Sequence, residues 1–222
     1  MSKEIKGNTP PVIRSLPYGI VLALYECQED MCRAFMRVQE FYENPTLAGI
    51  YTITREDVEE AYRPSLKGKR YEECFVGFNV PGGVFNSYFS QASSLTGLHE
   101  EETLLLEAIA SELMVHDETL NYIIASLIED VDTIDHEMAH ALYHASPEYR
   151  GEMDGLIKNM DAGAKEAIYA IFASGGAYHQ SVWDDELQAN LATGLSGRLV
   201  NIAERLGGYE FAFREVFSKY KA

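Results

Sequence analysis

Residues 131–144, VDTIDHEMAHALYH, carry two histidines four residues apart, with a glutamate directly after the first. On a helix this spacing corresponds to about 400° of rotation, so His136 and His140 share one face about a turn apart. Apolar residues on the same segment predict that the helix packs inward. They are Ile134, Met138, Ala141 and Leu142. If the two imidazoles bind a common ligand, the fold has to bring the remaining groups to that helix from elsewhere in the chain.

The chemistry of this spacing points to a metal. Two imidazoles on one helix face can reach one tetrahedral zinc ion. Glu137 follows the first histidine and points slightly to one side, where it can accept a proton from a zinc-activated water without binding the metal itself. HExxH also occurs by chance, but the apolar helix face and the β-rich segment 121–128 directly upstream strengthen the zinc hypothesis.

Around this motif, over residues 121–193, the chain resembles the zincin metallopeptidases. In that group an edge strand precedes the HExxH helix and aligns an extended substrate by main-chain hydrogen bonds. The resemblance implies Zn²⁺ as cofactor, His136 and His140 as metal ligands, and Glu137 as general base. The metzincin branch, HExxHxxGxxH, does not fit, because Tyr143 and Ser146 stand at its glycine and third-histidine positions.

A third ligand has to come from a later segment. Residues 182–194, VWDDELQANLATG, resemble the gluzincin glutamate helix, where an acid heads a helix and is followed by alanine and asparagine. The resemblance implies Glu186 as the third ligand. Asp185 and Asp184 are the reserve candidates, and an aspartate ligand would resemble the aspzincins instead. Alternatively, Glu186 is only an N-terminal helix acid favoured by the helix dipole.

Two further candidates precede that segment. Tyr178 and His179 follow the glycine pair at 175–176, and a loop there could offer a phenol or an imidazole to a tetrahedral oxyanion. We assign both as candidate catalytic residues. The alternative is an ordinary polar loop.

The remaining pattern predicts an α+β fold. Strands are expected within 18–26, 74–81 and 121–128, and helices at 30–42, from Thr54 onward with Asp57 as its capping partner, and at 99–114. The first 17 residues are expected to lie extended on the surface, and 81–83 to form a turn. Helices alone follow from 132, at 132–144, 148–160, 164–172 and 183–193, with one or two more up to residue 220.

This order predicts a mostly helical chain, with a small mixed sheet preceding the HExxH helix (zincin-like) and a helical C-terminal part. We expect a single zincin-like domain over 1–222. A possible subdivision separates an N-terminal α/β part, 1–115, from a helical metal-site part, 116–222.

The composition limits the classes of partner that we expect. A net charge of −17 repels phosphate backbones and anionic lipid, so neither nucleic acid nor membrane is expected as a partner. Apolar runs fall well short of the roughly 18 residues of a membrane span. The three cysteines form no CxxC pair, which favours reduced thiols and a cytoplasmic protein. The oligomeric state stays open.

Together these features predict a zinc-dependent hydrolase, a gluzincin-like metallopeptidase acting on a peptide or protein substrate. The alternative is a non-catalytic metal-binding or protein-interaction protein on a zincin scaffold. A structural zinc site needs no general base and usually has four protein ligands. Glu137 is present and no fourth cysteine or histidine is obvious, which favours the enzyme.

Overall fold

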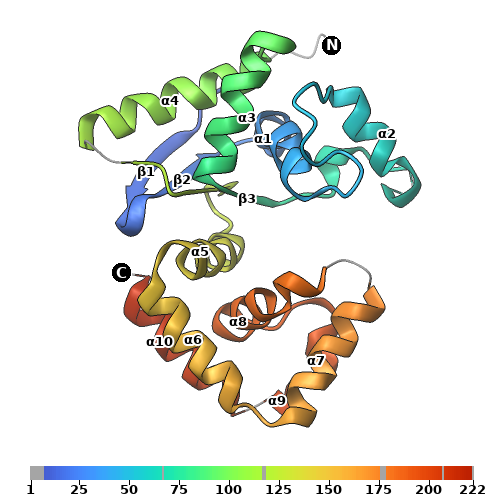
Figure 1. The fold of residues 1–222 in the computed structure, drawn as a ribbon, viewed down its shortest axis with the longest axis vertical. Helices are drawn as coiled ribbons and strands as arrows, with labels where there is room; N and C mark the ends of the chain where they lie inside the picture. The colour runs from blue at the N-terminus through green and yellow to red at the C-terminus, as the bar shows by residue number, and fades with distance from the viewer. Residues whose placement is uncertain (1–7, 67, 117–118, 176–178, 207, 222) are drawn as a thin grey trace. The chain divides into compact units, whose positions relative to one another are not determined.

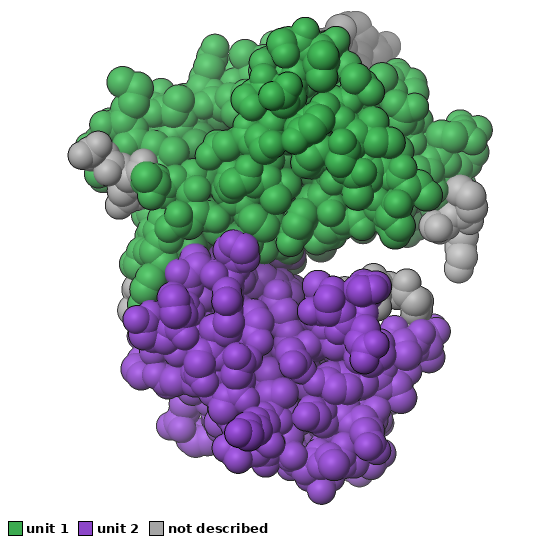
Figure 2. All heavy atoms as spheres, viewed as in Figure 1, with its two compact units in different colours: residues 1–134 green, residues 135–222 purple. Residues whose placement is uncertain are grey.

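The computed structural model describes residues 8–66, 68–116, 119–175, 179–206 and 208–221. The chain divides into two compact units, Met1–Ile134 and Asp135–Ala222, shown by ribbon in Figure 1 and by colour in Figure 2. The predicted α+β class is confirmed: a small mixed sheet precedes the HExxH helix, and within the described residues only helices follow it. The single-domain assignment stays a prediction. The division at 134 lies beyond the expected 115 because strand β4, Tyr122–Leu127, pairs within the first unit.

The first unit contains a four-stranded sheet with the order β1-β2-β4-β3. Strand β1, Val12–Leu16, pairs antiparallel with β2, Ile20–Tyr25, across a short 3-10 turn, η1, at Pro17–Gly19. Tyr18 and Gly19 adopt positive φ values of 67° and 70° in this turn. Residues 12–16 of the predicted extended segment thus form a paired edge strand, which the sequence did not reveal because they make only a short, half-exposed run.

Strand β4 lies inside the sheet. It pairs in parallel with β2 and antiparallel with β3, Gly77–Pro81. Parallel strands buried on both faces have mostly apolar sequences, which explains the apolar runs of β2, IVLALY, and β4, YIIASL. The expectation of an edge strand before the HExxH helix is therefore wrong, because β3 occupies the hydrogen-bonding edge that the zincin resemblance left free for substrate.

Helices cover one face of this sheet (Figure 1). They are α1 at Gln28–Glu43, α3 at Gly82–Leu95 and α4 at Glu100–His116. Helix α2 at Arg55–Leu66 and the 3-10 turn η2 at Tyr71–Glu73 pack against α1. Alternate β2 residues Val21, Ala23 and Tyr25 enter their common core. The predicted cap of α2 is confirmed: Thr54 Oγ1 accepts from Asp57 N at 3.1 Å, and Asp57 Oδ2 accepts from Thr54 N at 2.8 Å.

Helix α3 was not predicted, and the expected turn at 81–83 is wrong. Pro81 ends β3 and Gly82 begins α3 directly. A Cβ at Gly82 would stand 2.1 Å from Leu120 O, so this glycine allows two backbones to approach closely. The sequence signal of α3 is weak because its serines are poor helix formers. Inside the helix they donate back to carbonyls three residues earlier, as Ser90 does to Ser87 O.

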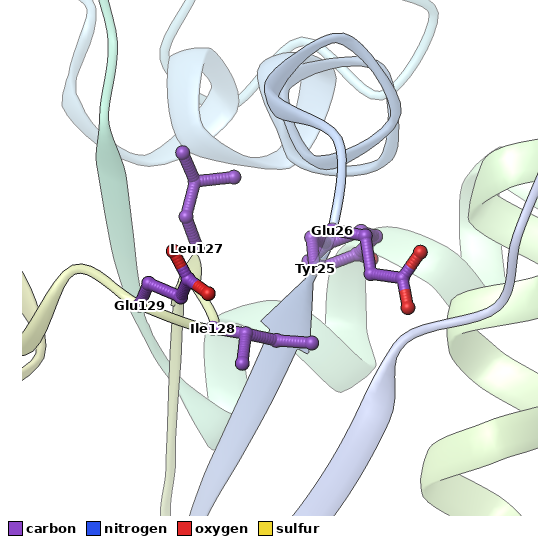
Figure 3. A pocket seen from close by; sticks show the side chains of 5 residues that line it. All are labelled: Tyr25, Glu26, Leu127, Ile128 and Glu129. Atoms are coloured by element: carbon purple, nitrogen blue, oxygen red, sulfur yellow. The ribbon is translucent and has the colours of Figure 1, made fainter.

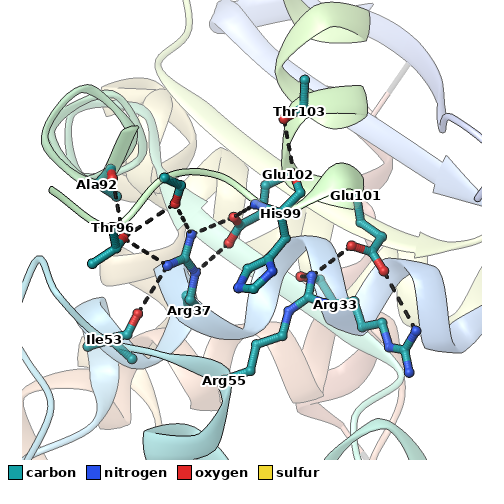
Figure 4. Close-up of polar contacts among 11 residues, drawn as sticks. Arg33, Arg37, Ile53, Arg55, Ala92, Thr96, His99, Glu101, Glu102 and Thr103 are labelled. Atoms are coloured by element: carbon teal, nitrogen blue, oxygen red, sulfur yellow. Dashed lines mark hydrogen bonds and ion pairs between the residues drawn. The ribbon is translucent and has the colours of Figure 1, made fainter. Parts of the chain in front are cut away.

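A buried ion pair ties this helical layer together (Figure 4). Arg37 on α1 and Glu102 on α4 are 1% and 0% exposed. The guanidinium donates to both carboxylate oxygens of Glu102, and its remaining N–H groups reach Ile53 O, Thr96 Oγ1 and Gly97 O. Every donor of the arginine is thus used, and two loops are fixed to two helices by one side chain.

The second unit is helical and confirms the predicted helices at 132–144, 148–160, 164–172 and 183–193. The HExxH helix, α5, spans Val131–Ala145, so its first four residues belong to the first unit. Ser146 caps α6 by accepting from Tyr149 N at 3.2 Å. The C-terminal helix α10 packs against α6 and α8. The elements after α5 are α6 at Pro147–Asn159, α7 at Ala162–Gly175, η3 at Gln180–Val182, α8 at Trp183–Thr193, η4 at Gly197–Ile202, α9 at Ala203–Leu206 and α10 at Tyr209–Tyr220.

Among the described residues, no helix is both long enough and apolar enough to span a bilayer.

Glu102→Gln is expected to destabilise the first unit by about 3–5 kcal/mol, because it leaves the buried guanidinium without a counter-charge. The measurement is urea-dependent hydrogen exchange of peptides from α1 and α4. Glu60→Gln is the matched control. It breaks the surface ion pair between Glu60 and Arg63, whose side chains are 65% and 72% exposed respectively. The loss should cost less than about 1 kcal/mol of stability. Equal losses in the two variants would contradict a stabilising role for the buried pair.

Candidate metal centre

Three side chains from two helices converge in the second unit. The ligand atoms of His136 and His140 on α5 and Glu186 on α8 all lie within 4.8 Å of one another. His136 Nε2 and His140 Nε2 are 3.3 Å apart, and Glu186 Oε1 is 3.8 Å from His140 Nε2. His140 is buried, with 6% of its surface exposed. Two nitrogens and one carboxylate oxygen therefore surround one point, and this is the set that the sequence predicted.

The outer nitrogen of His140 is held by a carboxylate. His140 Nδ1 lies 2.9 Å from Asp185 Oδ1. An ionised carboxylate only accepts hydrogen bonds, so Nδ1 has to be the protonated nitrogen. The neutral ring then carries its lone pair on Nε2, which faces the other two ligand atoms. Asp185, named from sequence as a reserve ligand, is placed to orient a ligand histidine instead.

Thr193 holds the outer nitrogen of His136 in a similar way. Its Oγ1 donates to Ala189 O at 2.7 Å, so toward His136 it can only accept. His136 Nδ1 lies 3.4 Å from that oxygen, a long hydrogen bond that favours the Nδ1–H form. Both rings are thus turned with Nε2 inward by partners on α8.

Without a metal, the two rings share protons unequally. Burial and the positive charge of His140 lower the pKa of His136 to about 4. Burial also disfavours the charged form of His140, but the charge and hydrogen bond of Asp185, together with the charges of Glu186 and Glu137, outweigh burial and raise the pKa of His140 to about 10. A protonated His140 can donate through Nε2 to the neutral His136. In this state the Nε2 proton of His140 lies between the two inner nitrogens, and a metal ion binding there would have to displace it.

The donor set fits zinc. Two imidazole nitrogens bound at about 2.0–2.1 Å in tetrahedral geometry stand roughly 3.3–3.4 Å apart, which the two Nε2 atoms match. Glu186 Oε1 lies farther from His140 Nε2, at 3.8 Å, than the two nitrogens lie from each other. A set of two histidines and one carboxylate leaves the fourth tetrahedral position for a small molecule, as catalytic rather than structural zinc sites do.

The other predicted residues are not all near this point. Glu137 is half-buried on α5, about 100° around the helix from His136, and its charge contributes to the raised pKa of His140. Asp184 is exposed and accepts from Tyr169 OH. His179 is exposed and caps η3, where its Nδ1 accepts from Ser181 N at 3.3 Å. Its catalytic role stays a prediction, and Tyr178 lies outside the described residues.

Sequence reasoning missed the supporting partners. Glu186 and Thr193 are seven residues apart, which is two helical turns, so a threonine on the face of the third ligand was a usable signal. The role of Asp185 had no such signal. Adjacent helical residues differ by about 100°, and only the crossing of α5 and α8 places Asp185 behind His140 while Glu186 lies in front.

A second concavity lies wholly in the first unit, at the C-terminal ends of the parallel strands β2 and β4 (Figure 3). Its volume is about 430 Å³. Two exposed glutamates stand at its rim, but the described part of the chain places no group of three metal-binding side chains there. The lining residues are Tyr25, Glu26, Leu127, Ile128 and Glu129.

The chain matches no protein-family model, no curated protein and no solved structure. The interpretation as a zincin therefore rests on the motif and on the geometry of the second unit, and it stays a prediction.

The purified protein is expected to bind about one equivalent of zinc, and Glu186→Gln should reduce its affinity sharply, because the site loses an anionic ligand. Asp184→Asn is the control on the same helix turn, and it should retain wild-type affinity, since its carboxylate faces Tyr169. Competition with a chromophoric chelator measures both. Equal zinc affinity in these two variants would remove Glu186 from the ligand set.

Proposed function

We propose that this protein is a zinc-dependent hydrolase that cleaves amide bonds in a peptide or protein substrate. One observation carries the proposal: two histidine nitrogens and a glutamate oxygen converge within 4.8 Å, and the histidines belong to an HExxH motif that supplies an adjacent carboxylate. The three free cysteines, Cys27, Cys32 and Cys74, support the cytoplasm as its place of action.

His136, His140 and Glu186 would hold the zinc ion. Bound there, zinc supplies Lewis acidity, which makes water more acidic and stabilises negative charge on a carbonyl oxygen. Asp185 and Thr193 keep the outer nitrogens of the two histidines hydrogen-bonded, so that the inner nitrogens remain available. These five residues bind and orient, and they exchange no proton with the substrate.

Glu137 is the proposed general base. It takes one proton from the attacking water while the water oxygen bonds to the carbonyl carbon. The C–N bond then breaks, and Glu137 passes that proton to the leaving nitrogen, so the products are a carboxylic acid and an amine. A half-buried glutamate beside the ligand set, with no metal contact required of it, suits this task.

The peptidase class proposed here is gluzincin-like, supported by a glutamate on a second helix, α8. One feature separates the chain from that resemblance, which implies an edge strand before the HExxH helix. Strand β4 has no free edge, so the proposal does not include alignment of the substrate along it.

Glu137→Gln is expected to lower the hydrolysis rate by about 10²–10⁴-fold, because an amide cannot take up the proton. Zinc content and thermal unfolding should stay at wild-type values, since the side chain keeps its shape and is not a ligand. Cleavage of a peptide library, followed by mass spectrometry, gives the rate. Glu166→Gln on α7, an exposed glutamate, is the matched control and should leave the rate unchanged.

Full activity in Glu137→Gln would exclude that residue as the base. A wild-type protein that binds zinc but cleaves no member of the library would instead favour the non-catalytic alternative. Removal of zinc with a chelator should abolish any cleavage, and added zinc should restore it.

A further inference from the structure

A buried glutamine joins three helices behind the candidate metal centre. Gln188 on α8 is 0% exposed. Its Nε2 donates to Ala139 O on α5 at 3.2 Å and to Asp185 Oδ1 at 2.9 Å. Its Oε1 accepts from Tyr149 OH on α6 at 2.8 Å, and Tyr149 is also 0% exposed. The side-chain amide thus uses both of its N–H groups and its carbonyl oxygen.

These contacts fix the direction of every hydrogen bond. A backbone carbonyl and a carboxylate can only accept, so the NH₂ group of Gln188 has to face Ala139 O and Asp185. The carbonyl oxygen therefore faces Tyr149, whose hydroxyl has to donate. A flipped amide would set its oxygen against two acceptors. One arrangement is satisfied, and it delivers an N–H to Asp185.

Asp185 Oδ1 consequently accepts two hydrogen bonds, one from Gln188 Nε2 and one from His140 Nδ1, each at 2.9 Å. The oxygen that orients the ligand histidine is itself held in place from the protein interior. Asp185 is only partly buried, with 28% of its side chain exposed, so without the amide it could turn toward water.

We propose that Gln188 is a positioning residue of the metal centre, supported by Tyr149: it holds Asp185 in the place from which Asp185 orients His140. The proposal rests on the metal site of the proposed function but concerns a residue that touches neither metal nor substrate. A residue that acts this way should change metal affinity through Asp185, and not only the stability of the fold.

Gln188→Met tests the proposal, since methionine fills a similar volume and cannot hydrogen-bond to Asp185. Zinc affinity, measured by chelator competition, is expected to fall about tenfold, the low end of what losing an outer-sphere partner costs. Tyr149→Phe is the milder variant, because it removes one hydroxyl and keeps both N–H groups of Gln188. Its loss should be smaller and in the same direction.

Asn190→Leu is the matched control. Asn190 is a second buried amide on α8, 3% exposed, and it bonds to Glu186 O and Ser196 Oγ instead of Asp185. It should lower the melting temperature comparably and leave zinc affinity within about twofold, since its hydrogen bonds reach the Glu186 backbone carbonyl and the Ser196 hydroxyl, and not Asp185 or a ligand side chain. Equal losses of zinc affinity in Gln188→Met and Asn190→Leu would mean that Gln188 only stabilises the fold, and would overturn the positioning role.

A double-mutant cycle tests whether Gln188 affects zinc binding through Asp185. If Gln188 acts through Asp185, then Gln188→Met combined with Asp185→Asn should bind zinc no more weakly than Asp185→Asn alone. Additive losses would overturn the proposal.

The metal-free protein provides a readout that does not depend on zinc binding. The Nδ1–H proton of His140 should give a slowly exchanging resonance in the wild type and in Asn190→Leu, and should exchange several-fold faster in Gln188→Met. Unchanged exchange in Gln188→Met would overturn the positioning role. A wild-type protein that binds no zinc but shows this difference would remove the proposed function and leave the positioning role standing.

Discussion

The hydrogen bond between His140 and Asp185 is the constraint on which the candidate metal centre depends. An imidazole presents a lone pair inward only when its other nitrogen keeps a proton, and the partly buried carboxylate of Asp185 at 2.9 Å secures that proton. This requires α5 and α8 to cross at one register, because a shift of one residue along α8 would put Glu186 in the place of Asp185 and Leu187 in the place of Glu186. The packing of the other helices of the second unit therefore has to fix how α5 and α8 cross.

Both units solve the same physical problem with different groups. A polar side chain removed from water has to find all of its partners within the protein, or its burial costs more than its contacts return. Arg37 meets this condition in the first unit with Glu102 and three further acceptors. Gln188 meets it in the second with one donor and two acceptors. Fully satisfied groups of this kind make one arrangement of the helices much better than its neighbours.

The predicted elements that held were those with strong local signals. Helix α2 has its capping box at Thr54, α6 its capping serine at Ser146, and β2 and β4 have unbroken apolar runs. Strand β1 and helix α3 were missed because their signals are weak: β1 depends on its partner β2, and α3 is rich in serine. The internal place of β4 was also unpredictable, since pairing order is decided by contacts between segments far apart in the chain.

For the metal centre, the sequence by itself determined the part that one helix can encode. Spacing along α5 fixes two histidines on one face and a glutamate beside them, because helical geometry repeats every 3.6 residues. Glu186 followed only through a resemblance. Only the tertiary structure decided the contacts on which the proposed supporting roles rest: Asp185 with His140, Thr193 with His136, and Gln188 with Asp185. Those roles depend on how two helices cross, and a crossing is set by the packing of the whole unit, which no local pattern of residues records.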